Sequence, residues 1–283
     1  MGKYLVSYDG TRIYYNHHKG RNPLTLVFLH GVGANWTVWR KEVNYFKRRG
    51  YSTLAMDFRG HGRSDMPPEF EKYRPPLFAR DLYEILQFEN VNNFVLLGHS
   101  LGGAIAVNYC MLYKRNYPRS LVLVESTITY PFDHNRLFNL SPYVTHFLRF
   151  IASHQLTRQQ QFTHFDDIDL SHPGIEERLH LISHMLHLTP LRCIVRTLDN
   201  VERYVFKNKG KIYTTLQHLR LPTLLLAGEL DHIIPPRFSR KIKSIDHRAV
   251  LKIIEGAHHR VIINDPGKVC HIIDTFLHDN QKN

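Results

Sequence analysis

A serine between two glycines lies where a strand pattern gives way to a helix pattern. The segment reads G-H-S-L-G, with Ser100 at its centre, and it follows the run N-F-V-L-L at 93–97. A turn this tight has no room for side chains beside the serine, and Gly98 and Gly102 lack the Cβ atoms that would clash. Its tip would hold the serine in a strained conformation with the hydroxyl projecting from the sheet. A plain turn could have this composition, but the context favours a nucleophile.

A serine hydroxyl needs a neighbouring base to take its proton, and the pKa of histidine suits that task near neutral pH. The chain has 20 histidines, so composition alone does not identify the base. The base should lie in a loop beyond the last core strand, at the edge from which the serine projects. The segment I-I-E-G-A-H-H-R places His258 and His259 there. The residues alone leave both candidates open.

A third group must orient the imidazole and stabilise its charged form. Asp231 leaves a buried strand in the segment A-G-E-L-D-H-I-I-P-P. A carboxylate is costly at that position unless it is paired, which favours Asp231 as the acid. Glu125, at the end of the strand that follows the helix after Ser100, is the alternative acid, and Asp231 could instead only cap the next helix.

Acyl transfer places negative charge on a carbonyl oxygen, which two preorganised main-chain N–H groups can hold. Leu101, directly after the serine, supplies one such donor. The loop L-H-G-V-G-A-N-W follows the first buried strand, and Gly31 and Gly33 let its backbone turn so that the N–H of Val32 can point at the site. We interpret His30 in this loop as a structural residue that braces it.

Strand and helix patterns alternate along most of the chain and determine where these groups lie. A hairpin is expected over 3–8 and 12–16, with Asp9-Gly10 at its turn. The other predicted strands cover 24–29, 52–56, 93–97, 121–124, 223–228 and 249–254, and the predicted helices cover 36–49, 75–88, 101–113 and 266–278. This alternation predicts an α/β fold with a mostly parallel central sheet flanked by helices.

The alternation stops after Glu125. Only helical segments are expected from about 131 to 216, at 142–151, 175–187 and 191–206. The simplest organisation is one α/β core made of residues 1–130 and 217–283, with 131–216 as a helical insertion.

The charge of the chain is strongly basic. It has 37 Lys and Arg against 25 Asp and Glu in 283 residues, a formal net charge of +12. This balance favours an anionic surface or substrate as a partner, but the basic residues are scattered. Clusters such as 47–49 and 240–243 are interpreted as solvated faces, so nucleic-acid binding is not expected.

Other classes are disfavoured by what the sequence lacks. Cys110, Cys193 and Cys270 are far apart and form no C-x-x-C pair, which is typical of reduced thiols in a cytoplasmic protein. No apolar run resembles a signal peptide or a membrane-spanning helix, so no stable membrane insertion is expected. The histidines show no metal-binding spacing, and neither a metal nor an organic cofactor is expected.

Five motifs occur in order from about Leu24 to the C-terminus: F-L-H-G-V-G, D-F-R-G-H-G-R-S-D, G-H-S-L-G-G, G-E-L-D-H-I-I-P and G-A-H-H. Together they resemble the α/β-hydrolase superfamily, in particular its esterase-like and lipase-like members with a helical lid. The resemblance implies Ser100 as nucleophile, Asp231 as acid and the insertion as a lid or cap. It also selects His259, because in the family the base stands seven positions before a loop proline, here Pro266. The family usually has glycine where this chain has His258.

The resemblance also narrows the chemistry. The D-F-R-G-H-G-R-S-D loop is mainly structural in the family, where residues equivalent to Asp57 and Arg59 fix neighbouring loops. Members similar to haloalkane dehalogenases and epoxide hydrolases have aspartate at the elbow, whereas this chain has Ser100. The expected function is therefore hydrolysis of carboxylic esters of a small or medium hydrophobic substrate, through an acyl-enzyme intermediate.

Several alternatives remain open at this level. Arginines of the predicted lid could meet an anionic group, as in an acyl-CoA thioesterase; they are Arg149, Arg158, Arg178, Arg192 and Arg196. Amphipathic lid helices could touch lipid transiently, as in a monoacylglycerol-type lipase. A C–C bond hydrolase, an amidase or peptidase, a lyase and a non-catalytic ligand-binding protein are the other possibilities. The natural substrate and the oligomeric state are not predicted.

Overall fold

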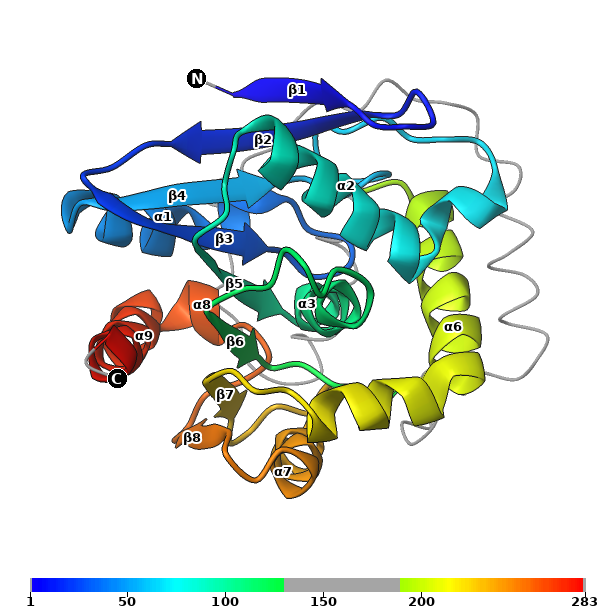
Figure 1. Ribbon diagram of the computed structural model, residues 1–283. Coiled ribbons are helices and arrows are strands. Elements are labelled where there is room, and N and C mark those ends of the chain that lie inside the picture. The colour runs from blue at the N-terminus through cyan, green and yellow to red at the C-terminus, as the bar shows by residue number, and fades with distance from the viewer. Residues whose placement is uncertain (1, 130–188, 282–283) are drawn as a thin grey trace.

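The computed structural model describes residues 2–129 and 189–281, and Figure 1 shows their arrangement. Their core is an eight-stranded sheet with strand order β1-β2-β4-β3-β5-β6-β7-β8. Its strands are β1 (Lys3–Val6), β2 (Arg12–His18), β3 (Asn22–Leu29), β4 (Tyr51–Met56), β5 (Phe94–His99), β6 (Ser120–Val124), β7 (Thr223–Gly228) and β8 (Val250–Ile254). Only β1 and β2 run antiparallel to their neighbours; from β4 to β8 all the pairs are parallel.

Helices cover both faces of this sheet. They are α1 (Arg40–Arg48), α2 (Pro75–Phe88), α3 (Leu101–Leu112), α6 (Leu191–Gln217), α7 (Pro236–Ile245), α8 (Val261–Asn264) and α9 (Pro266–Gln281). Two apolar cores result: α2, α3, α6 and α7 contribute to the core on one face, and α1, α8 and α9 to the core on the other. The central parallel strands are buried along their whole length because helices cover both of their faces.

The fold predicted from the sequence is confirmed. Each predicted strand is present with ends shifted by no more than two residues, apart from the hairpin, whose first strand is shorter and whose second is longer. The helix predicted over 36–49 begins as a 3-10 turn at Trp36–Trp39. The Asn35 side chain caps this turn by accepting a hydrogen bond from the Thr37 N–H. The sequence pattern did not single out α7.

The predicted insertion falls mostly outside the described residues. The helices expected over 142–151 and 175–187 lie there, and the division of the chain at 130 and 216 stays a prediction. The segment expected to be helical over 191–206 forms the first part of α6, which continues to Gln217. Buried residues of α6 such as Val201 and Val205 pack against the core that also contains α3.

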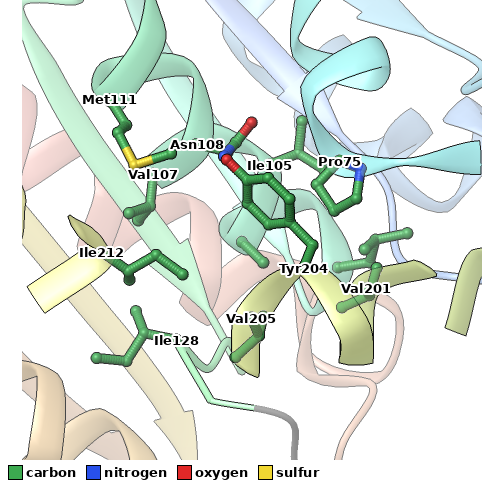
Figure 2. Close-up of a pocket in the computed structure, with 12 residues that line it drawn as sticks. Pro75, Ile105, Val107, Asn108, Met111, Ile128, Val201, Tyr204, Val205 and Ile212 are labelled. Carbon is green, nitrogen blue, oxygen red and sulfur yellow. The ribbon is translucent and has the colours of Figure 1, made fainter. Parts of the chain in front are cut away.

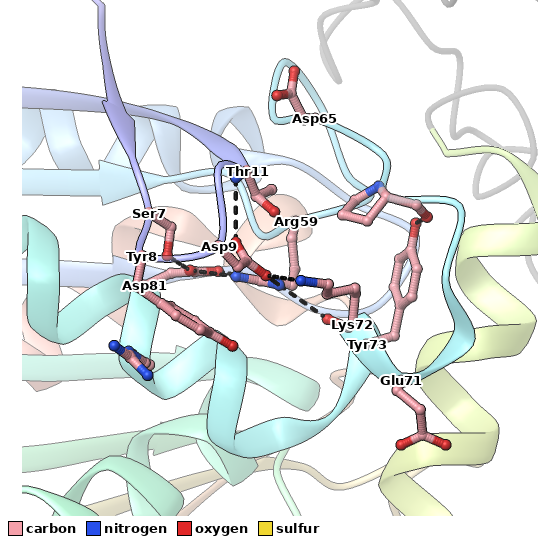
Figure 3. Close-up of polar contacts among 12 residues, drawn as sticks. Ser7, Tyr8, Asp9, Thr11, Arg59, Asp65, Glu71, Lys72, Tyr73 and Asp81 are labelled. Carbon is pink, nitrogen blue, oxygen red and sulfur yellow. Dashed lines mark hydrogen bonds and ion pairs between the residues drawn. The ribbon is translucent and has the colours of Figure 1, made fainter.

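A buried ion-pair network connects the first hairpin to the loop after β4 (Figure 3). Arg59 donates to both carboxylate oxygens of Asp81 on α2, each at 2.7 Å, and to Asp9 in the β1–β2 turn at 3.0 Å. Lys72 also donates to Asp9, at 2.8 Å. Because the Arg59 side chain is fully buried, loss of one partner would leave an uncompensated charge in the interior. The network thus holds the 57–65 loop in place.

No helix among the described residues is both long enough and apolar enough to cross a membrane.

Glu42 on α1 is a buried acid. Its carboxyl group faces the interior, and neither oxygen has a hydrogen-bond partner among the residues that the structure describes. Burial raises the pKa of Glu42 from 4.5 to about 8. The native state therefore keeps this proton at neutral pH, where the unfolded chain has lost it.

We expect Glu42→Gln to raise stability relative to the wild type as the pH rises from about 5 to 8. Below pH 4.5 both the native and the unfolded wild type hold the Glu42 proton. Above that pH the unfolded state loses it first, so the free energy of unfolding of the wild type falls by up to ~1.4 kcal/mol per pH unit. Urea unfolding across this range measures the difference in free energy of unfolding. Glu255→Gln, at an exposed position, is the control and should show no such slope. Parallel pH curves for wild type and Glu42→Gln would contradict the assignment.

Candidate active site

The candidate site lies at the carboxyl ends of four adjacent parallel strands. Ser100 follows β5, Glu125 follows β6, Asp231 follows β7 and His259 follows β8. Since parallel strands end at the same edge of a sheet, residues separated by more than a hundred positions meet there.

Ser100 is at the tip of a strained turn. Its φ of 51° and ψ of −115° lie outside the regions that side-chain-bearing residues normally adopt. The turn is held by a hydrogen bond of 2.9 Å from the Ser100 N–H to the Val124 carbonyl. A Cβ on Gly98 would overlap the backbone of Gly102 and Gly103, so the strand and helix can approach only with glycine there. This is the geometry expected of the nucleophile elbow, with α3 starting at the next residue.

His259 and Asp231 are hydrogen-bonded to each other. The distance from His259 Nδ1 to Asp231 Oδ2 is 2.8 Å, and both residues are buried. The other oxygen of Asp231 accepts hydrogen bonds from the main-chain N–H groups of Ile233 and Ile234, each at 2.8 Å. Burial raises the pKa of Asp231, but His259 and these two donors outweigh it, so that this pKa lies below its usual value. A carboxylate can only accept, so the proton lies on Nδ1 and leaves Nε2 as the basic nitrogen.

Hydrogen bonds do not connect all three predicted catalytic residues. Among the described residues, no hydrogen bond connects the Ser100 hydroxyl to His259, although His259 is bonded to Asp231. Hydrogen bonds of this kind are often long in the absence of substrate. His258 lies elsewhere in the loop, with its ring 6.3 Å from that of His232 between centroids. The structure therefore pairs His259, rather than its neighbour, with Asp231.

Two main-chain donors adjoin the serine. In the part of the chain that the structure describes, no hydrogen bond engages the N–H of Val32 or of Leu101. The Val32 loop passes close to the elbow: a Cβ on Gly31 would lie 3.3 Å from the Cβ of Ser100. The loop and the first turn of α3 can therefore direct both N–H groups toward one oxygen.

Two buried polar side chains hold this loop. His30 donates from Nδ1 to the Gly31 carbonyl at 2.7 Å and accepts at Nε2 from the Phe58 N–H at 3.0 Å, the bracing role expected from the sequence. Burial lowers the pKa of His30 well below its usual value, so the ring is neutral. Asp57 accepts from the Trp36 N–H at 2.7 Å and the Arg63 N–H at 2.9 Å. Burial raises the pKa of Asp57 to about 7, despite these hydrogen bonds.

His99 is a site residue that the sequence analysis does not single out. Its Nε2 lies 3.1 Å from Glu125 Oε2 and 3.2 Å from the carbonyl oxygen of His259. The only sequence signal was its place in the G-H-S motif, directly before the serine. His99, Glu125 and His259 bring potential metal-ligand atoms within 4.8 Å of one another. The hydrogen bonds already explain this proximity, so we assign no metal to the three residues.

An apolar pocket opens between α3 and α6, beside the residue that follows Ser100 (Figure 2). Its lining is almost entirely apolar: Pro75, Leu101, Ala104, Ile105, Val107, Asn108, Met111, Ile128, Val201, Tyr204, Val205 and Ile212. The polar exception is a pair in which the Asn108 amide donates to the Tyr204 hydroxyl at 2.6 Å. Such a lining suits a hydrocarbon group.

Comparisons with known proteins identify the family to which this chain is similar. A sequence model of the alpha/beta hydrolase family matches residues 26–272. Epoxide hydrolase 3 of Xenopus tropicalis is 28% identical over 290 residues, which cover 92% of this chain and 72% of that protein. Human Protein ABHD8 is 24% identical, and the match covers 90% of this chain but only 55% of that protein.

Solved structures share the fold at low identity. The esterase EaEST from Exiguobacterium antarcticum superimposes with a TM-score of 0.76 at 21% identity, covering 98% of this chain and all of that one. A thermophilic esterase from Thermogutta terrifontis gives a TM-score of 0.73 at 20% identity, with 99% of both chains covered. At these identities the likeness shows the fold alone.

Proposed function

The chain belongs to the alpha/beta hydrolase family, and from this premise we propose that it hydrolyses carboxylic esters through an acyl-enzyme intermediate on Ser100. The observation that carries the proposal is the 2.8 Å hydrogen bond from His259 to Asp231, at the same sheet edge as the strained serine. An imidazole whose Nδ1 is bound to a carboxylate, so that Nε2 is the basic nitrogen, is the group that activates an elbow serine at the same sheet edge.

In the first half of the reaction the Ser100 Oγ attacks the ester carbonyl carbon and passes its proton to His259 Nε2. The oxygen that becomes negative accepts hydrogen bonds from the N–H groups of Val32 and Leu101. Asp231 stabilises the imidazolium formed on His259. When the tetrahedral intermediate collapses, the bond to the alkoxy oxygen breaks, and His259 gives its proton to the departing alcohol.

In the second half a water molecule attacks the acyl group on Ser100. His259 accepts one proton from this water, and a second tetrahedral intermediate forms at the same carbonyl carbon. Its collapse breaks the bond to Ser100 Oγ, which recovers its proton from His259. The carboxylic acid leaves and the free enzyme is restored, so that no cofactor takes part in the balance.

Epoxide hydrolysis is the second candidate, because two similar proteins are named Epoxide hydrolase 3 and Epoxide hydrolase 4. The elbow residue weighs against it. A carboxylate that opens an epoxide forms an ester, which water can cleave, whereas Ser100 would form an ether that the same machinery could not hydrolyse. The serine therefore favours acyl chemistry, in which the intermediate is itself an ester.

The pocket between α3 and α6 indicates the substrate class. It begins at Leu101, one of the two proposed oxyanion donors, and is lined almost entirely by apolar side chains. We propose that it receives a small or medium hydrocarbon part of the ester. Thioesters and lipid esters share the same acyl chemistry and are tested alongside.

A substrate panel tests the proposed function directly. We expect turnover of p-nitrophenyl esters, with higher kcat/KM for medium acyl chains than for acetate, because the apolar pocket gains contact area with each methylene. The panel also contains a styrene oxide-type epoxide, an acyl-CoA, an anilide and a monoacylglycerol. Hydrolysis of the epoxide without any ester turnover would overturn the proposal in favour of the second candidate.

A further inference from the structure

We propose that Glu125 and His99 are positioning residues for the base His259, and that the Glu125 carboxylate also stabilises the imidazolium that forms during the reaction. The inference rests on the proposed function, since it assigns His259 as the base. It adds a second carboxylate to the one supplied by Asp231.

The two residues hold the main chain that carries His259. His99 Nε2 lies 3.2 Å from the carbonyl oxygen of His259, and the Val261 N–H donates to Glu125 Oε2 at 3.3 Å. The two side chains are themselves joined at 3.1 Å. Main-chain groups on both sides of Arg260, one of them the carbonyl of His259, are therefore tied to the ends of β5 and β6. A base held in this way keeps its imidazole aimed without reorganisation.

The protonation of His99 follows from its contacts. A carbonyl oxygen can only accept, so the proton shared with His259 and Glu125 belongs to His99 Nε2. Burial beside the His259 ring lowers the pKa of His99 to about 3, so the ring stays neutral. His99 thus transmits a fixed hydrogen bond and adds no positive charge that would oppose protonation of His259.

Backbone strain singles out Glu125. Among the described residues, the non-glycine residues with positive φ are Asn90, Ser100 and Glu125. Asparagine tolerates this conformation, and Ser100 is the elbow. Glu125, with φ of 47° and a fully buried side chain, has neither explanation. Strain and buried charge both cost free energy, and they concentrate where a site requires a side chain in one place.

The Glu125 carboxylate is close enough to act on the His259 ring through its charge. Its oxygen is one of the three ligand-type atoms that all lie within 4.8 Å of one another, the other two being ring nitrogens of His99 and His259. Among residues 2–129 and 189–281, the other groups seen beside this ring are Asp231 on Nδ1 and the neutral His99, whose ring centroid is 5.2 Å away. The next residue, Arg260, is buried. Two hydrogen bonds to Oε2, from His99 Nε2 and from the Val261 N–H, favour the ionised form of the Glu125 carboxyl group, which would then supply a second negative charge at the base.

Glu125→Gln tests the proposal because it removes the charge and preserves the size. We expect kcat/KM for a p-nitrophenyl ester to fall about ten- to a hundredfold, and the acidic limb of its pH profile to move to lower pH by about one pH unit. The direction follows from the charge: with one carboxylate fewer, the imidazolium loses its proton more readily. The matched control is Glu229→Gln, directly after β7, where an exposed carboxylate accepts a hydrogen bond from the Gly256 N–H. The control should keep the wild-type profile.

A second readout does not depend on activity. The His259 Nδ1 proton in the hydrogen bond to Asp231 should give a downfield NMR signal, assigned by its loss in Asp231→Ala, and its titration midpoint should fall in Glu125→Gln. His99→Asn weakens the hydrogen bonds to Glu125 and to the His259 carbonyl but keeps the Glu125 carboxyl group. This variant should slow turnover without moving that midpoint. If Glu125→Gln does not fold, Glu125→Met replaces it. Unchanged profile and midpoint in the folded variant would overturn the inference, whereas absence of ester turnover in the wild type would overturn only the proposed function.

Discussion

Ser100→Ala is expected to lower kcat/KM for a p-nitrophenyl ester by at least about 10⁴-fold, to a level set by binding and the oxyanion donors alone. The reason is chemical, because an alanine methyl group cannot form the acyl-enzyme. Initial rates, measured at enzyme concentrations high enough to detect the residual turnover, give the ratio.

The fold should survive this change. Ser100 has positive φ, and alanine carries the same Cβ into that strained position, so no new backbone strain is created. Thermal unfolding should therefore stay within a few degrees of the wild type. Activity above about a tenth of the wild-type value, in a variant freed of any co-purifying esterase, would contradict Ser100 as the nucleophile.

Replacing His259 should nearly abolish activity, whereas replacing its neighbour His258 should change it little. We expect His259→Ala to lower kcat/KM by about 10³- to 10⁴-fold, since it removes the base and leaves the buried Asp231 without its partner. His258→Ala is the matched control, one residue away in the same loop, and should change kcat/KM by less than about threefold. Steady-state kinetics on the same ester measures both.

The comparison discriminates between candidates that the residue types leave equal. A larger loss in His258→Ala than in His259→Ala would show that the loop rearranges on substrate binding and that the Asp231 contact is structural. Equal losses would point to damage of the whole loop. Only the asymmetric result fits the geometry, in which His258 lies toward His232 instead.

Much of the fold follows from local patterns in the sequence. The buried strands read as continuous apolar runs and the helices between them as amphipathic stretches, so the parallel sheet and its order of elements could be predicted. The elbow could also be predicted from the sequence, because a strand, a glycine-flanked serine and a helix are adjacent in the chain. Each of these signals lies within a window of about twenty residues.

Which side chains pair within the site was harder to predict from the sequence, since the pairing depends on residues far apart in the chain. Asp231 and His259 are 28 positions apart, and only the packing of β7 against β8 shows which histidine reaches the acid. Glu125 could be seen as a rival acid, but its partner turned out to be His99, 26 positions earlier on the neighbouring strand. The sequence pattern does not predict that Asp231 is bonded to the His259 ring and Glu125 to the His99 ring.

Buried acids in polar-looking helices form a second class of feature that sequence patterns hide. α1 reads R-K-E-V-N-Y-F-K-R, and nothing in that string distinguishes Glu42 from a solvated residue. Glu42 is nevertheless buried, on a helix that packs against β4 and against α9, which lies much later in the chain. Helical periodicity places Glu42 on the side of Val43 and Phe46 only once that side is known to face inward.

The most direct test of the central claim is the site of covalent labelling by a fluorophosphonate. The reagent phosphonylates a serine only when a base takes its proton and the fluoride leaves, so labelling reports the activated nucleophile itself. Intact-protein mass should show one adduct, peptide mapping should place it on Ser100, and His259→Ala should label far more slowly. No adduct, or an adduct on another residue, under conditions that label a known serine esterase would contradict the account.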